Sequence, residues 1–257
     1  MDEIIKKFAS DEVYYSDYSF VTNSQLGLIK RSPATYQHYR DNPSDRPITK
    51  ALNFGRAFHM CMLEHDKYEK EVVVEPDVNK RTKAGKEEYQ KFLDLHSGMT
   101  ILSHDEDESL TGMRKKLTSS VEAMELLSGG IAEQVNVWND PDTKIACKGK
   151  ADYWNKDRNI LVDIKTTQDS SPDGFRKSAY KYGYDRQASF YLDGFGVDQF
   201  WFIVIEKSAP YNMAIYNCSE EFIDEGRMKY KKLLDMYSLY FIQQLFDPYE
   251  HVYTGTL

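Results

Sequence analysis

The sequence predicts an α/β protein in which a mixed central sheet is flanked by helices. The first observation is a set of three consecutive strand-like segments, 132–138, 144–154 and 159–167, joined by short polar turns. The second is a pair of further strand-like segments at 199–207 and 212–218. The third is that longer segments, with the apolar spacing of amphipathic helices, lie before, between and after these strands. This combination is typical of a sheet covered by helices.

The N-terminal part is expected to provide helices that cover one side of the sheet. Residues 1–20 are charged and rich in tyrosine but have no clear period, so we expect a flexible arm that orders only against a neighbour. Capping signals then open three helices, at residues 23–24, at residues 32–33 and at residue 49. In the third of these helices, Gly55 lowers helix stability and is expected to permit close packing. Residues 71–76 are predicted to form a strand.

The rest of the chain continues the same alternation. A charged amphipathic helix is expected over 83–96, and the capping box Ser103 to Glu106 opens the helix that follows it. After the three-strand meander we expect further helices, over residues 172–180, 184–195 and 220–245. No internal repeat or low-complexity linker interrupts the sequence, so residues 1–257 are predicted to form a single domain.

The end of the third predicted strand carries two adjacent charges. Asp163 and Lys165 share one face of that strand because side chains alternate, whereas Ile164 takes the other face. Asp152, near the end of the preceding strand, adds a carboxylate across the turn, and such oxygen ligands suit Mg²⁺. The alternative is an ordinary surface ion pair. The apolar run before Asp163 and the polar residues from Thr166 onwards favour a strand end that opens into a cleft.

Four motifs occur in the order found in PD-(D/E)xK nucleases of the RecB-like branch. They are a Gly-x-x-x-His helix, an acidic residue before the core strands, an Asp followed by Asp-x-Lys, and a Gln-x-x-x-Tyr helix. The matching residues are, in chain order, Gly55, His59, Glu133, Asp152, Asp163, Lys165, Gln187 and Tyr191. Over residues 20–245 the chain resembles the catalytic domain of phage and prophage exodeoxyribonuclease VIII, the RecE type. The resemblance implies a restriction-endonuclease-like core.

The resemblance also implies roles for these residues. Asp152 and Asp163 would bind Mg²⁺, or Mn²⁺ as a substitute, with help from the backbone carbonyl of Ile164. His59 and Glu133 would complete or extend the metal shell. Lys165 would orient the attacking water, lower its pKa and offset the charge that grows on the phosphorane. Gln187 and Tyr191 would position Lys165 or the scissile phosphate.

The implied activity is hydrolysis of phosphodiester bonds at the ends of linear double-stranded DNA. The resemblance further implies 5′→3′ digestion that leaves 3′ single-stranded tails, a ring-shaped homo-oligomer such as a tetramer, and a RecT-type single-strand-annealing partner. It also implies a phage or prophage gene. Because residues 1–12 lack a signal-peptide core, we expect the protein in the cytoplasm of a bacterial host. Three alternatives remain open: an endonuclease, a catalytically silent protein of the same fold that binds DNA ends or acts as a scaffold, and a globular protein in which the charged residues form only ion pairs.

Charge and cysteine content limit the other classes of function. The net charge of −8 is unusual for a DNA-binding protein, so phosphate contacts would have to come from local basic clusters. The candidates for DNA contact are Lys83, Lys86, Thr166, Arg176 and Lys177. The alternative is that each basic cluster is a solvated helix face. Three cysteines cannot supply the four ligands of an iron–sulfur cluster, and no apolar run approaches a membrane span, so we expect neither a cluster nor a membrane association.

Overall fold

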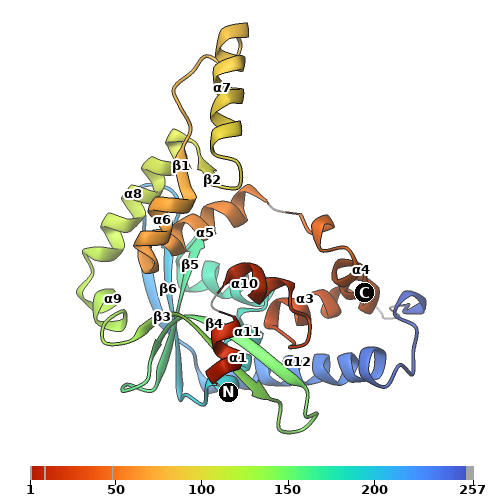
Figure 1. Cartoon of the computed structure of the whole chain (residues 1–257). Helices are drawn as coiled ribbons and strands as arrows, with labels where there is room; N and C mark the ends of the chain where they lie inside the picture. Colours follow the sequence, from red (N-terminus) through yellow and green to blue (C-terminus); the bar gives the residue numbers. More distant parts are fainter. Residues whose placement is uncertain (1, 9, 48, 253–257) are drawn as a thin grey trace.

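The computed structural model describes residues 2–8, 10–47 and 49–252, and its centre is a five-stranded mixed sheet (Figure 1). The strand order is β3-β4-β5-β6-β7. The strands are β3 (Ile131–Asn139), β4 (Ala146–Asn155), β5 (Ile160–Thr167), β6 (Gln199–Glu206) and β7 (Met213–Asn217). The first three strands form an antiparallel meander, β5 pairs with β6 in parallel, and β6 pairs with β7 antiparallel. The predicted α/β class with a mixed sheet is confirmed.

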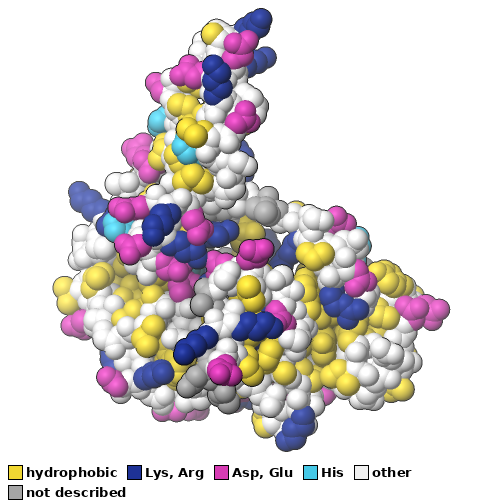
Figure 2. Space-filling model, viewed as in Figure 1, with side chains coloured by type: hydrophobic (Ala, Val, Ile, Leu, Met, Phe, Trp, Pro, Cys, Tyr) yellow, Lys and Arg dark blue, Asp and Glu magenta, His cyan; other side chains and the backbone are white. Residues whose placement is uncertain are grey.

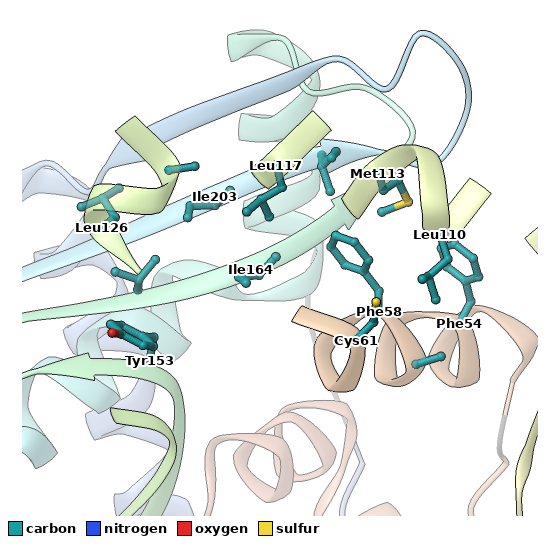
Figure 3. Close-up of a cluster of buried hydrophobic side chains, with 14 of the residues drawn as sticks. Phe54, Phe58, Cys61, Leu110, Met113, Leu117, Leu126, Tyr153, Ile164 and Ile203 are labelled. Carbon is teal, nitrogen blue, oxygen red and sulfur yellow. The ribbon is translucent and has the colours of Figure 1, made fainter. Parts of the chain in front are cut away.

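One face of the sheet is covered by three helices from the first half of the chain. They are α5 (Lys50–Leu63), α8 (His104–Thr118) and α9 (Val121–Leu126). Figure 3 shows their apolar side chains, among them Phe58, Met113 and Leu126, meeting Ile164 of β5 and Ile203 of β6. This cluster buries the alternate residues of β5 and leaves Asp163 and Lys165 for the opposite face.

The opposite face is covered by the helices of the second half of the chain. These are α10 (Pro172–Tyr182), α11 (Tyr184–Phe195) and α12 (Glu220–Tyr237), which continues into a π-helical turn over Ser238–Ile242. Helices α10 and α11 form the crossover between the parallel strands β5 and β6, and α12 packs on α11. Two N-terminal helices, α3 (Asn23–Arg31) and α4 (Pro33–Asp41), pack with α12 in a further apolar cluster. Short 3₁₀ turns occur at Pro43–Asp45 and Pro248–Glu250.

A projection rises from the body between α5 and α8. Helix α6 (His65–Glu71) leads into β1 (Val72–Val74), which pairs in parallel with β2 (Thr100–Leu102). Between these strands the chain extends outwards and returns as α7 (Lys83–Leu95), which stands clear of the body (Figure 1). The strand predicted at 71–76 is thus present but shorter, and β2 was not predicted from the sequence.

The described residues of the segment 1–20 are packed on the sheet, where a flexible arm was expected. Helices α1 (Asp2–Lys7) and α2 (Asp11–Ser16) lie along the edge strand β3, and Phe8 and Tyr14 are buried against its valines. Lys148 of β4, which is 0% exposed, donates hydrogen bonds of 2.7 Å to the backbone oxygens of Tyr14 and Asp17. A buried ammonium needs such acceptors, so the segment supplies polar contacts that β4 requires.

Two further observations concern helices. The prediction that Gly55 permits close packing is wrong, because a Cβ placed there would meet no atom within 4 Å. Among the helices of the described residues, none combines the length and the apolar character that crossing a membrane would require.

Candidate active site

The candidate site begins where strands β4 and β5 separate. Their antiparallel pairing ends at Tyr153 and Val162, and the next residues in register are Asp152 and Asp163. Because the ladder stops there, the backbone N–H of Ile164 is free to donate to Asp152 Oδ2 at 2.8 Å. The two aspartates predicted from sequence therefore stand side by side at the opening between two strands.

Asp163 lies at the centre of a buried polar group. Its side chain is 2% exposed, and its Oδ2 lies 2.6 Å from Lys165 Nζ. Its Oδ1 accepts a hydrogen bond of 2.5 Å from Gln187 Nε2 of α11. Lys165 Nζ also lies 4.8 Å from the centre of the Tyr184 ring, a cation–π contact. Gln187 therefore fixes the orientation of the Asp163 carboxylate, whose other oxygen faces Lys165.

A second group of polar side chains adjoins the first. His59 Nδ1 of α5 lies 3.2 Å from Asp152 Oδ2. His59, Glu133 and Asp152 each offer a ligand atom, and these three atoms all lie within 4.8 Å of one another. Glu133 has a φ of 50°, which is uncommon for a residue other than glycine and typical of strained functional positions. The strand β3 is thus distorted where its carboxylate joins the group.

The pKa values follow from burial and from mutual charge. Burial lowers the pKa of His59, but the adjacent Asp152 carboxylate more than compensates and raises it to about 9. Burial, assisted by the nearby Asp152 charge, raises the pKa of Asp163 to about 6. Burial also lowers the pKa of Lys165, yet the Asp163 and Asp152 carboxylates raise it above its ordinary value. The two carboxylates therefore favour the charged form of Lys165.

The residues fit a divalent cation. The group offers one imidazole nitrogen and the carboxylate oxygens of Glu133 and Asp152, which is a donor set that divalent metals accept. Among the described residues, none donates a hydrogen bond of ordinary geometry to the buried Asp163 Oδ2, although the Lys165 ammonium is adjacent. The structure brings His59, Glu133 and Asp152 together as the ligand cluster, and places Asp163 beside it in contact with Lys165 and Gln187.

Some residues near this site were not found from the sequence. Tyr184 precedes Gln187 by three residues, so the shared helix face was an available signal. Lys150 precedes Asp152 by two residues on β4 and lies 2.8 Å from Glu133 Oε2, so strand alternation pointed to it as well. Asp11 of α2 lies 2.7 Å from the same ammonium, and no local pattern relates it to the site.

The other predicted residues lie at varying depth. The Tyr191 ring packs on Gly149 of β4, since a Cβ at Gly149 would lie 2.9 Å from a Tyr191 ring carbon. Thr166 of β5 is half-buried, whereas Arg176 and Lys177 are exposed on α10. Lys83 and Lys86 are exposed on α7, the projecting helix. Figure 2 shows acidic and basic side chains gathered below this projection, over α5 and α6.

The role of His59 gives a testable prediction. His59 is protonated below about pH 9 without metal, so a metal ion must displace a proton to bind its nitrogen. We expect the Mn²⁺ affinity of the protein to rise by up to about tenfold per pH unit between pH 6.5 and 9. His59→Ala should weaken the affinity and flatten this pH profile in isothermal titration calorimetry.

His38→Ala and His65→Ala are the matched controls. Both histidines are exposed and pair only with surface carboxylates, at 3.1 Å from Asp45 and 3.4 Å from Glu69. If all three substitutions change the Mn²⁺ affinity equally, His59 has only a structural role.

Comparison with known structures agrees with the fold. A crystal structure named "Putative exonuclease" from Eubacterium rectale superposes with a TM-score of 0.63 at 11% identity, covering 98% of this chain and 94% of that chain. An alkaline exonuclease from Laribacter hongkongensis matches with a TM-score of 0.41 at 13% identity, over 92% of this chain and 96% of that one. A comparison with curated proteins gives no significant match.

The family comparison covers most of the sequence. Residues 22–245 match the model of a PDDEXK-like domain of unknown function, DUF3799. The matched range contains the divergent strands β4 and β5 and each of the residues His59, Glu133, Asp163 and Lys165. The chain therefore belongs to the PDDEXK-like DUF3799 family and has the fold of that nuclease superfamily.

Proposed function

We propose that this chain is a metal-dependent deoxyribonuclease that hydrolyses phosphodiester bonds from the ends of linear double-stranded DNA. The observation that carries the proposal is that two groups of buried and half-buried polar side chains lie next to one another. The Asp163–Lys165–Gln187 group adjoins the cluster of His59, Glu133 and Asp152. Removing this many charges even partly from water is costly for stability, so a purely structural ion-pair network is a poor explanation.

The residues of the chain divide the chemistry between them. A divalent cation at His59, Glu133 and Asp152 would polarise the scissile phosphate and lower the pKa of the attacking water. By the resemblance of the motifs, we propose Asp163 and the backbone carbonyl of Ile164 as its further ligands. Lys165 holds its positive charge beside that position, so it can orient the water and offset negative charge on the phosphorane. Gln187 fixes the orientation of Asp163, which in turn fixes the Lys165 ammonium. The half-buried His59 imidazole favours Mn²⁺ at least as well as Mg²⁺, since first-row transition metals accept nitrogen ligands more readily.

Contacts with DNA belong to the same proposal. Thr166, the half-buried residue that follows Lys165 on β5, is a proposed contact for a phosphate next to the scissile one. Arg176 and Lys177 on α10, and Lys83 and Lys86 on the projection, offer exposed cations to the backbone of the duplex. By the resemblance of its motifs, we also propose 5′→3′ polarity, 3′ single-stranded products, a tetrameric ring and a RecT-type annealing partner in a bacterial cytoplasm.

The test compares linear and covalently closed circular duplex DNA, each with Mg²⁺, with Mn²⁺ and with EDTA. We expect loss of linear DNA with either metal, no loss with EDTA, and survival of the closed circle. Duplexes labelled at one 5′ or one 3′ end report the polarity. Cleavage of the closed circle would identify an endonuclease instead, and binding of ends without cleavage would identify a silent end-binding protein.

A further inference from the structure

Three cations from separate elements converge on one carboxylate of the N-terminal segment. Asp11, the first residue of α2, lies 2.5 Å from Lys67 Nζ of α6 and 2.7 Å from Lys150 Nζ of β4. A guanidinium nitrogen of Arg56 on α5 lies 3.8 Å from the same side chain. Although burial by itself raises it, the hydrogen bonds from Lys150 and Lys67 lower the pKa of Asp11 to about 2. This position therefore strongly favours an anion.

The anion position borders the candidate metal cluster. Arg56 precedes His59 by three residues, so both side chains project from neighbouring positions on α5. Lys150 precedes Asp152 by two residues, and its ammonium lies 2.8 Å from Glu133 Oε2. A group held by the three cations is thus next to the proposed metal ligands.

The cations do not depend on Asp11 for neutralisation. Each one has a second carboxylate partner from the body of the protein. The pairs are Arg56 with Glu71 at 3.0 Å, Lys67 with Glu64 at 3.3 Å, and Lys150 with Glu133 at 2.8 Å. Asp11 is therefore an additional anion, and the position it fills is one where a different anion can be held.

The attachment of α2 does not depend on Asp11 either. Lys148 holds the backbone of Tyr14 and Asp17 from within the sheet, and its ammonium lies 4.2 Å from the centre of the buried Phe8 ring. Asp11 stands at the start of a six-residue helix whose N-cap, Ser10, makes no side-chain capping bond. The start of such a helix opens at low cost, so Asp11 can leave the cations while the rest of the segment stays in place.

We propose that Arg56, Lys67 and Lys150 form a subsite for a phosphate group of the nucleic acid, and that Asp11 occupies this subsite until the phosphate displaces it. This inference rests on the proposed nuclease function for the identity of the ligand. A phosphate ester offers more acceptor oxygens than a carboxylate and matches the planar donors of Arg56. A terminal phosphate also carries more charge than a backbone diester, so it competes better with Asp11.

The first experiment measures binding of inorganic phosphate in EDTA, without any metal. Asp11→Asn should bind phosphate about tenfold more tightly than the unmodified protein by isothermal titration calorimetry. Asp17→Asn is the matched control, because it makes the same charge change in the same segment, where Asp17 pairs with Lys7. Lys67→Gln, added to Asp11→Asn, should abolish the gain. Lys67→Gln alone, which leaves Asp11 unchanged, should bind phosphate more weakly than the unmodified protein.

Thermal melts of every variant accompany the titrations. If Asp11→Asn binds phosphate no better than the unmodified protein, or if Asp17→Asn gains as much, the subsite is refuted. If Asp11→Asn does not fold, Lys67→Gln alone is compared with the unmodified protein. Equal phosphate affinity of these two proteins refutes the subsite.

The second experiment uses linear duplexes with 5′-phosphate, 3′-phosphate or hydroxyl ends. Asp11→Asn should lower KM and leave kcat close to that of the unmodified protein. A KM gain confined to one phosphorylated end identifies a terminal phosphate as the ligand, and a gain on all ends identifies a backbone phosphate. An unchanged KM on every end refutes the subsite, even if cleavage is normal. Tighter phosphate binding without any nuclease activity would instead uphold the subsite and overturn the proposed function.

Discussion

Lys165→Ala is expected to reduce the rate of DNA cleavage by at least about 100-fold. The reason is that Lys165 is the only cation within contact of Asp163 among the described residues, and its charge is fixed beside the proposed position of the attacking water. Asp163→Asn should cause a comparable loss, because it removes the carboxylate that holds the ammonium. Initial rates on linear duplex DNA, measured at saturating Mg²⁺, give the comparison.

The fold should survive the substitution at Asp163. Asparagine has the shape of aspartate, and its Oδ1 can still accept the hydrogen bond from Gln187, so the packing of β5 against α11 is kept. The matched control is Lys156→Ala, a lysine of the turn between β4 and β5 that also makes a cation–π contact, 4.3 Å from the Trp154 ring. Its activity should stay normal. Near-normal cleavage by Lys165→Ala or by Asp163→Asn would refute the assignment of the active site.

Gly226→Ala is expected to lower the free energy of unfolding by about 3 kcal/mol. A Cβ at Gly226 of α12 would lie 2.1 Å from the backbone oxygen of Asp185 on α11, and a backbone atom cannot move aside as a flexible side chain can. Because α11 also carries Gln187, displacement of this helix should weaken cleavage together with stability. Urea denaturation followed by circular dichroism measures the change.

Gly55→Ala provides the opposite case. It is also a glycine within a helix, but a Cβ there meets nothing within 4 Å. Alanine favours the helix over glycine, so the free energy of unfolding should rise by up to about 1 kcal/mol. If the two substitutions change stability by the same amount, the close contact between α11 and α12 is not a determinant of stability.

Elements with local signals could be predicted well. Ser103 and Glu106 form the predicted capping box of α8, with both of its hydrogen bonds present. Helix α11 has the predicted limits of residues 184 and 195, because Gly183 and Gly196 both adopt left-handed conformations at its ends. The capping of α3 shows the limit of such signals, since Thr22, rather than the neighbouring Asn23 or Ser24, is the cap. Several adjacent polar residues can each serve as a cap, and packing selects one of them.

The candidate site was predicted in part. The strand meander and the alternation of side chains placed Asp152, Asp163 and Lys165 together, and β4 and β5 have this arrangement. Sequence did not show that Asp163 contacts Gln187 and Lys165, whereas His59 and Glu133 join Asp152. That division depends on the parallel pairing of β5 with β6, since only a crossover through α10 and α11 brings α11 over β5.

The sequence by itself therefore determined the five strands of the central sheet and most of the longer helices, because caps, turns and alternation act over a few neighbouring residues. It did not reveal β2 or the helices within residues 1–20. The tertiary structure alone decided which distant charges meet. Asp11 and Lys150 lie 139 residues apart, and no local pattern links them. They are brought together because Lys148 needs acceptors inside the protein and holds the N-terminal segment against β4. Contacts of this kind form because charges are buried together in the folded chain. They cannot be predicted from neighbouring residues in the sequence.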